Sequence, residues 1–122
     1  MNKGRLLFHN GRVIWLSDYS TLAGEEYIRD INDTGQAYLQ YCDDTNVDKM
    51  PCMLDFTGSK IDAKIVDVLR KNALHINKHC DKLGAIGVST FLNMFASTIT
   101  MLSGIQIKAF LTKEEALDWL SS

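Results

Sequence analysis

The sequence is short of the features that mark several large classes of protein. Its 122 residues contain one proline and three cysteines, and no apolar run long enough to cross a membrane. An odd number of cysteines without close spacing is not a disulfide framework, which favours a reduced protein. Charged and polar residues interrupt the N-terminal stretch "MNKGRLLFHNGR", so it does not read as a signal peptide. We therefore expect a cytoplasmic protein without membrane insertion.

An excess of basic charge is also missing. Lys and Arg total 13, Asp and Glu total 15, and the net charge is −2. Binding to nucleic acid needs a basic footprint, so we expect no nucleic-acid partner. The hydrophobic share of 46% and the charged share of 23% are those of an ordinary globular protein. A chain of this length fits one domain, residues 1–122, that buries roughly two-thirds of its unfolded surface.

The first elements of the sequence predict a β-hairpin. Asn10 and Gly11 lie between two apolar runs, and Asn-Gly in that setting is the strongest short hairpin signal. The pattern places strands near 5–9 and 12–18.

A long helix is predicted next, over residues 24–44. Apolar residues recur there at helical spacing, and Glu25 and Glu26 suit the first turn, where the helix dipole favours anions. Gly35 weakens the middle of such a helix by about 1 kcal/mol relative to alanine. The sequence therefore predicts either a break or close packing at Gly35.

Strands and helices then alternate three times. The apolar runs "CMLDF", "LGAIGVS" and "IQIKAFL" are each followed by a helical pattern, over 61–82, 90–104 and 112–120. Thr112 and Glu115 have capping-box spacing at the start of the last helix. Alternation of this kind implies parallel strands. We therefore predict an α/β fold, with an N-terminal hairpin and a mixed, mostly parallel sheet of about five strands with helices packed on it.

Several short segments together resemble a known family. The segments are "DYSTLAGEEY", "LDFTGSKID", "AIGVSTF", "LSGIQIKAF" and "EEALDWL", and they extend from residue 18 to residue 120. They resemble the STAS domain, the fold of anti-sigma-factor antagonists and of the cytoplasmic ends of sulfate transporters. The similarity is closer to small stand-alone bacterial STAS-like proteins, a largely uncharacterised group. The resemblance implies a STAS-like fold and a regulatory role more than an activity.

The resemblance also draws attention to Ser59. In the anti-sigma-factor antagonists, phosphorylation of a serine at the start of the second helix controls binding to a partner kinase. That serine lies in Asp-Ser-Ser-Gly or a close variant, and "DFTGSKID" departs from it. Ser59 falls at the comparable helix start, and Thr57 is the other nearby hydroxyl. The third helix departs as well, because its first turns, "TFLNMF", lack the lysines that relatives often carry.

Four hydroxyl side chains follow two strands of the predicted sheet. Thr57 and Ser59 follow the third strand, and Ser89 and Thr90 follow the fourth. Ligands of open parallel sheets bind beyond the carboxyl ends of the strands, and free N–H groups at helix starts favour anions. The rival interpretation is simple helix capping, which we favour because serine and threonine are common caps and Asp55 adds negative charge.

Residues typical of metal sites or catalysis are sparse. His75 and His79 lie four residues apart beside Cys80, but no further ligand pattern accompanies them, and both are expected on the solvent side of their helix. Cys52 lies in an apolar strand and is expected to be an inert core thiol. No Gly-x-Ser-x-Gly elbow is present. We expect no metal, no cofactor and no enzymatic activity.

The predicted third helix is apolar on two sides. One stripe, suited to packing on the sheet, consists of Leu92, Phe95, Ile99 and Leu102. A second stripe consists of Phe91, Met94 and Met101. A second stripe indicates either deeper burial within the monomer or an interaction surface, and methionine suits an adaptable surface. We expect a homodimer or a complex with a protein partner through this second stripe.

These observations favour a non-catalytic regulatory or protein-interaction module. The alternative is a protein that binds a small apolar or anionic ligand, lipid-like or nucleotide-like, between the sheet and the third helix. The identity of the partner or ligand does not follow from the sequence.

Overall fold

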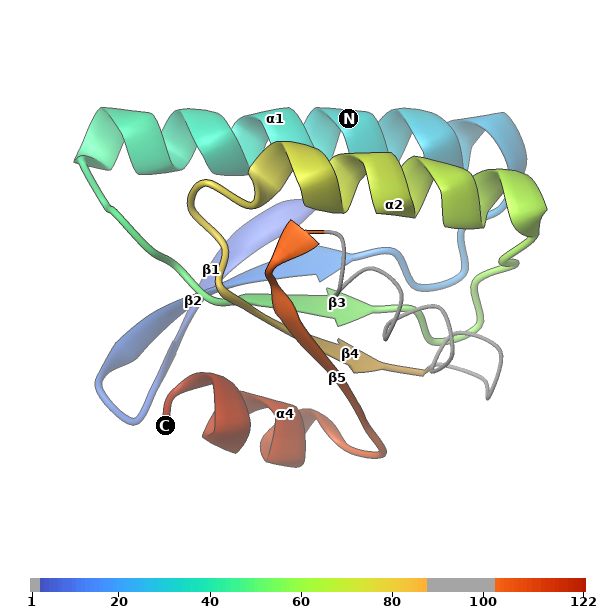
Figure 1. Cartoon of the computed structure of the whole chain (residues 1–122). Coiled ribbons are helices and arrows are strands. Elements are labelled where there is room, and N and C mark those ends of the chain that lie inside the picture. Colours follow the sequence, from blue (N-terminus) through green and yellow to red (C-terminus); the bar gives the residue numbers. More distant parts are fainter. Residues whose placement is uncertain (1–2, 88–102) are drawn as a thin grey trace.

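A hairpin and three parallel strands form a single sheet. The computed structural model describes residues 3–87 and 103–122. The described elements are β1 (Gly4–His9), β2 (Arg12–Asp18), α1 (Gly24–Thr45), β3 (Cys52–Asp55), α2 (Ala63–Ile76), β4 (Lys82–Ile86), β5 (Gln106–Phe110) and α4 (Lys113–Leu120) (Figure 1). The strand order is β1-β2-β3-β4-β5, with β1 antiparallel to β2 and the remaining neighbours parallel. The predicted α/β fold is confirmed.

The hairpin turns where the Asn-Gly pair predicts. Asn10 and Gly11 have φ values of 49° and 77°, so both adopt the left-handed region that a type I′ turn requires. His9 and Arg12 are paired on either side of the turn. The turn thereby determines the register of β1 against β2.

Gly35 is a point of close packing and not a break. Helix α1 continues through it, from Gly24 to Thr45. A Cβ atom at Gly35 would lie 2.1 Å from Oδ1 of Asn72, which belongs to α2. The missing side chain lets the two helices approach each other.

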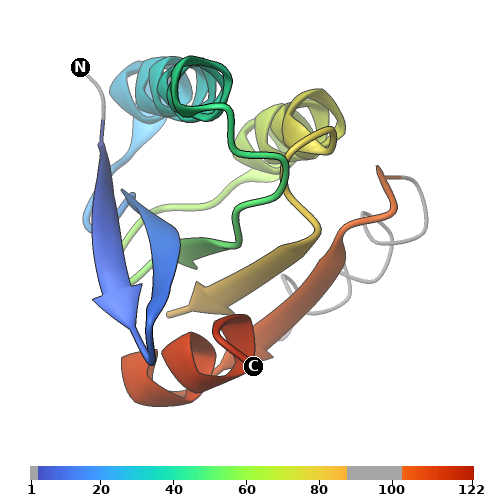
Figure 2. The ribbon, with the colours of Figure 1, turned by 90° about the vertical axis from the view of Figure 1, so that its left-hand side faces the viewer.

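Among the described elements, two helices cover one face of the sheet and one helix covers the other (Figure 2). Trp15 of β2 packs edge-on against Tyr38 of α1 with ring centroids 5.6 Å apart, in the larger core below α1 and α2. Its neighbour Leu16 points to the opposite face and packs in the smaller core with Leu117 and Leu120 of α4. Strands buried on both faces explain why the sequence shows continuous apolar runs.

Helix α4 begins at its predicted cap. Thr112 Oγ1 accepts a hydrogen bond from the backbone N–H of Glu115 at 3.2 Å. Leu117 and Leu120 are buried against the sheet, and Trp119 is partly buried. Helix α4 therefore packs on the sheet through its bulky apolar residues.

Candidate functional site

Strands β2, β3 and β4 end at one edge of the sheet, which we call the carboxyl edge. Asp18 at the end of β2 is paired with Asp55 at the end of β3, and Asp55 is paired with Ile86 at the end of β4. In Figure 1 this edge lies to the right, where the arrows of β2, β3 and β4 point. The loops that follow these strands therefore lie side by side, as expected for a site in a parallel sheet.

Backbone hydrogen bonds join the loop after β2 to the loop after β3. The N–H of Thr21 donates to Thr57 O at 3.0 Å, and the N–H of Lys60 donates to Leu22 O at 2.9 Å. Thr21 has a φ of 62°, a left-handed conformation that is uncommon for a threonine. The two loops consequently form one unit.

The residue after β4 is in close contact with this unit. A Cβ atom at Gly87 would lie 2.5 Å from the backbone nitrogen of Thr57, and Gly87 has a φ of 73°. The N–H of Phe56 also donates to Ile86 O at 2.9 Å. Only glycine combines that backbone conformation with so close an approach.

Ser59 has its hydroxyl held within the turn after β3. Its Oγ donates to Phe56 O at 2.9 Å and lies 3.1 Å from the phenol oxygen of Tyr27, which belongs to α1. Burial raises the pKa of Tyr27 to about 12. Ser59 itself is half-buried. The hydroxyl therefore connects the turn to α1 and stays within reach of solvent.

The predicted helix start near residues 59–61 is wrong by a few residues. Helix α2 begins at Ala63, and its N-cap is Asp62, whose Oδ1 accepts from the N–H of Ile65 at 2.9 Å. Aspartate is as good a cap as serine. The bond from Lys60 N–H to the neighbouring loop keeps the chain in a turn beyond Ser59. Ser59 therefore lies three residues before the cap.

The contacts of Thr57 and Ser59 are those of a turn, and neither residue is the N-cap of α2. Asp55 Oδ1 accepts from the N–H of Thr57 at 2.9 Å, and the N–H of Ser59 donates to Phe56 O at 3.0 Å. Hydrogen bonding from Ser20 lowers the pKa of Asp18, so this carboxylate is ionised at neutral pH. The backbone N–H groups of Thr57 and Ser59 are already bonded to protein and are not available to an anion. The carboxylates of Asp18 and Asp55, at the ends of two neighbouring strands, add negative charge to this edge.

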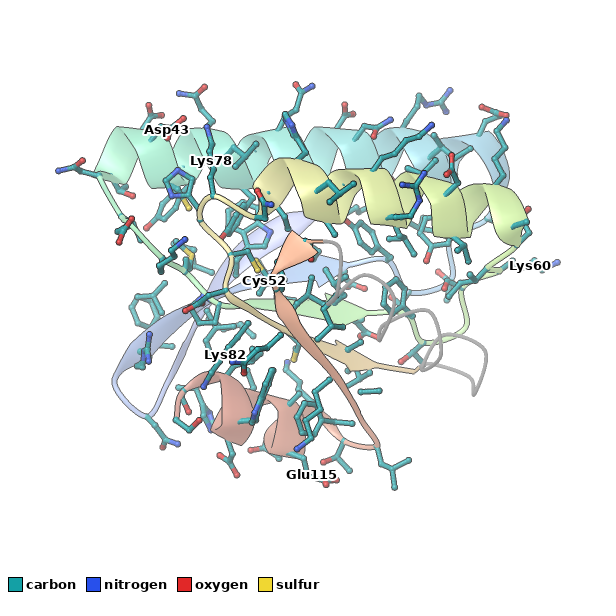
Figure 3. All side chains as sticks on the ribbon, in the orientation of Figure 1. Asp43, Cys52, Lys60, Lys78, Lys82 and Glu115 are labelled. Carbon is teal, nitrogen blue, oxygen red and sulfur yellow. The ribbon has the colours of Figure 1, made fainter. Side chains whose placement is uncertain are left out.

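The three thiols are buried near one another in the larger core. Cys42, Cys52 and Cys80 are all free and buried. Tyr38 OH donates to Met50 O at 2.7 Å, and Cys52 Sγ approaches the same oxygen at 3.9 Å. Burial raises the pKa of both Cys42 and Cys52, which keeps these thiols protonated and unreactive. Cys52 is the inert core thiol that the sequence predicts (Figure 3).

His75 and His79 differ in position. His75 is exposed, as predicted, but His79 is half-buried, and that prediction is wrong. His79 Nδ1 lies 2.8 Å from Asp48 O, and its Nε2 lies 3.0 Å from Asp43 Oδ1. The reason is that α2 ends at Ile76, so helical spacing no longer applies at residue 79. Within residues 3–87 and 103–122, no group of three His, Cys, Asp or Glu side chains could hold a metal ion.

A shallow polar groove lies between α1 and α2. Its volume is about 350 Å³, and its lining consists of Asn32, Gln36, Lys71, Asn72 and His75. Amide and charged groups of this kind do not suit a lipid-like molecule. The sequence predicts a ligand site elsewhere, between the sheet and residues 90–104. Most of that segment lies outside the described residues.

Several residues named from the sequence lie outside the described part of the chain. They are Ser89, Thr90 and the two stripes of the predicted third helix, which consist of Phe91, Met94 and Met101 and of Leu92, Phe95, Ile99 and Leu102. Their roles remain predictions. Among the helices that are described, none combines the length and the apolar character needed to span a membrane.

Comparisons with known proteins support the fold. A crystal structure of an uncharacterised protein of the DUF3478 family from Shewanella loihica PV-4, described as having a SpoIIAA-like fold, matches with a TM-score of 0.68. The match covers 96% of this chain and 91% of that chain at 14% sequence identity. No family model matches the chain, and no curated protein matches it. At this level of identity the likeness concerns the fold alone, and it confirms the STAS-like fold expected from the sequence.

Proposed function

We propose that this protein is a non-catalytic regulatory or protein-interaction module, similar in role to the anti-sigma-factor antagonists. The SpoIIAA-like fold supports the proposal at the level of architecture. The chemistry of Ser59 supports it further. In the described residues, its hydroxyl contacts a backbone carbonyl and a phenol that stays protonated at neutral pH. Neither group is a general base that would turn Ser59 into a nucleophile.

The partner docks on the loops of the carboxyl edge. Thr21, Thr57 and Lys60 are exposed there, and Figure 3 shows Lys60 pointing away from the molecule. Backbone bonds already hold the two loops together, so docking would cost little conformational entropy. A pre-organised surface of this kind suits recognition of a protein.

Ser59 is the control point of that surface, and its hydroxyl contacts carry this part of the proposal. Phosphorylation removes the proton that Ser59 donates to Phe56 O and adds nearly two negative charges. Asp55 precedes this turn and Asp62 caps the helix that follows it, and both carboxylates repel the added charge. The turn must then rearrange, and Lys60 moves with it. Modification of Ser59 would therefore change partner binding without unfolding the domain.

Site-specific photo-crosslinking tests the docking surface. A photo-reactive amino acid at Thr57 should capture a protein partner in cells, because this side chain is exposed at the carboxyl edge. The matched position is Thr45, which is exposed at the C-terminal end of α1 and distant from that edge in Figure 1. Capture at Thr57 and not at Thr45 is the expected result.

Substitutions at Ser59 then test control. Ser59→Asp in the Thr57 crosslinking background should change the yield several-fold, while Ser59→Ala should leave it near the original value. Asn10→Asp adds the same charge at the hairpin, whose left-handed turn tolerates aspartate, and serves as the control. Equal capture from Thr57 and Thr45 would refute the docking surface. Equal yield from Ser59→Asp, Ser59→Ala and Asn10→Asp would refute the control role of Ser59.

A further inference from the structure

Strand β1 is an open edge of the sheet in the described part of the chain. It pairs with β2 on one side only. Figure 2 shows it as the outermost strand, opposite β5. Natural proteins protect such edges with proline, with charge or with a covering segment. The sequence of β1, GRLLFH, contains no proline, and Arg5 is its one permanently charged residue.

The ladder with β2 determines which backbone groups of β1 face outward. The N–H of Asp18 donates to Lys3 O at 3.0 Å, so Lys3 faces β2. Bonding direction alternates along an antiparallel strand, and the odd-numbered residues of β1 therefore bond to β2. The N–H and C=O groups of Leu6 and Phe8 consequently point away from the sheet.

An apolar strip accompanies this open backbone. The Phe8 residue is 76% exposed, although it lies in a strand. Leu6, Val13 and Tyr41 are partly buried and pack against the larger core. Leu6 and Phe8 share one face because side chains alternate along a strand. Unpaired backbone beside exposed apolar side chains favours the addition of another strand.

We propose that β1 pairs antiparallel with β1 of a second copy of this chain, around a two-fold axis at Leu7. In this register, Leu6 lies opposite Phe8 of the second copy, and both face the same side of the joined sheet. The outward N–H groups of Leu6 and Phe8 gain carbonyl partners in each copy. Leu6 with Phe8 is an apolar cross-strand pair of the kind that stabilises antiparallel sheets.

The charges of the edge are complementary in this register. Arg5 lies opposite His9 of the second copy. His9 Nε2 is 2.7 Å from Asp118 Oδ1, and the Asp118 side chain is 67% exposed. Each arginine therefore approaches a carboxylate, and the two arginines do not face each other. A two-fold interface requires that one surface supply both halves of every contact, and this edge does so.

The helices leave room for the second copy. Trp15 of β2 packs against Tyr38 and Tyr41, and the N–H of Lys3, just before β1, donates to Thr34 Oγ1, so α1 lies over both β1 and β2. Two copies of α1 placed midway between these strands would be separated by two strand spacings, about 10 Å. Packed helices need only about 8–10 Å between their axes. Both copies of α1 therefore fit on the same face of the joined sheet.

Light-scattering mass measurements of the whole chain test the pairing. The wild type should have about twice the 13.7 kDa mass of one chain. Phe8→Pro removes an outward N–H and the exposed ring but spares the ladder to β2, and edge strands tolerate proline. This variant should be a folded monomer by circular dichroism. Phe8→Thr keeps the N–H and should weaken the dimer less. Leu111→Thr removes the 95% exposed Leu111 elsewhere on the surface, and its mass should stay that of the wild type.

Hydrogen exchange tests the register. In the wild type, the outward amide of Leu6 should exchange as slowly as the inward amide of Leu7, and in diluted Phe8→Thr it should exchange much faster. A monomeric wild type, or a dimer that Phe8→Pro leaves intact, overturns the proposal. If Met94→Glu with Met101→Glu separates the dimer while Phe8→Pro does not, the interface belongs to residues 91–101. None of these results depends on Ser59, so the proposed function is tested separately.

Discussion

In residues 3–87 and 103–122, the two faces of the sheet are covered by helices of very different length. On one face, α1 and α2 have 22 and 14 residues and enclose a core of aromatic, aliphatic and thiol side chains. On the other face, α4 has eight residues and packs over Ile14, Leu16 and Met53. The short helix packs close to the sheet at Gly84. A Cβ atom at Gly84 would lie 3.2 Å from Leu120 Cδ1.

The proposed control site belongs to only one of these two faces. The contacts of Ser59 and Tyr27 belong to the face that carries α1 and α2. Helix α4 contributes burial to the other face, and it contacts the hairpin through His9 and Asp118. Damage to the α4 face should therefore lower stability while the arrangement at Ser59 persists in the molecules that remain folded.

Removal of residues 113–122 should have the largest effect. It exposes Ile14, Leu16 and Met53 to water, and each loses much of a burial free energy of about 1.5–3 kcal/mol. The sum is comparable to the stability of a whole domain. Thermal unfolding followed by near-UV circular dichroism should show a midpoint lower by tens of degrees or no transition. Glu114→Ala, on the exposed side of α4, is the control, and an unchanged midpoint after the deletion would contradict the role of α4.

Leucine truncations on the two faces should sharpen the comparison. Leu69→Ala in α2 leaves a cavity between two long helices and the sheet, and it should cost about 3–5 kcal/mol. Leu120→Ala lies in the last turn of a short helix that can shift into the space, and it should cost about 2–3 kcal/mol. Denaturant unfolding of both variants measures the difference. A larger loss for Leu120→Ala would show that α4 is held as rigidly as α2.

Glycine substitutions on the two faces should differ in the size of their effect on the free energy of unfolding. Gly84→Ala presses a new methyl group on Leu120, which is fully buried, and should cost about 1–2 kcal/mol. Gly35→Ala meets the end of the half-exposed Asn72 side chain, which can rotate outward, while alanine adds about 1 kcal/mol of helix propensity. Gly35→Ala should therefore be close to neutral. Denaturant unfolding of both variants measures the change in the free energy of unfolding. An equal loss for Gly35→Ala and Gly84→Ala would show that Asn72 cannot move.

The smallest effect concerns pH. The hydrogen bond from Ser20 lowers the pKa of Asp18 in the folded protein, so the ionised form stabilises the fold above the unfolded pKa. This contribution disappears as pH falls through the lowered pKa. Asp18→Asn should reduce the free energy of unfolding by less than about 1 kcal/mol at pH 7, because solvent screens the charge. The difference from the wild type should shrink as pH falls below the unfolded pKa and vanish once Asp18 is protonated in the folded protein. A difference that is constant with pH would point to lost packing.

Local signals account for the elements that the sequence predicts well. Asn10 and Gly11 can both adopt positive φ, and Thr112 caps α4 with its own hydroxyl. Both outcomes depend on neighbours within a few residues. The alternation of strands and helices similarly limits the topology to a mostly parallel sheet.

The errors fall where distant residues decide between local alternatives. Ser59 and Asp62 are both suitable caps, and the bond from Lys60 N–H to Leu22 O favours Asp62. His79 follows a helix whose end the pattern did not locate, and it contacts Asp43 of α1 and the backbone of Asp48. Neither contact has a signature in the local sequence, since the partners are tens of residues apart.

The sequence by itself determined the class of fold, the hairpin and the cap of the last helix, because each depends on short-range conformational preference and on the period of apolar residues. Only the tertiary structure decided which loops join at the carboxyl edge, which hydroxyl contacts Tyr27 and which backbone groups of β1 are left open. Those features depend on strand order and on contacts between distant segments. The physical reason is that such a contact forms only after the chain has folded back on itself, and many sequences satisfy the same local pattern.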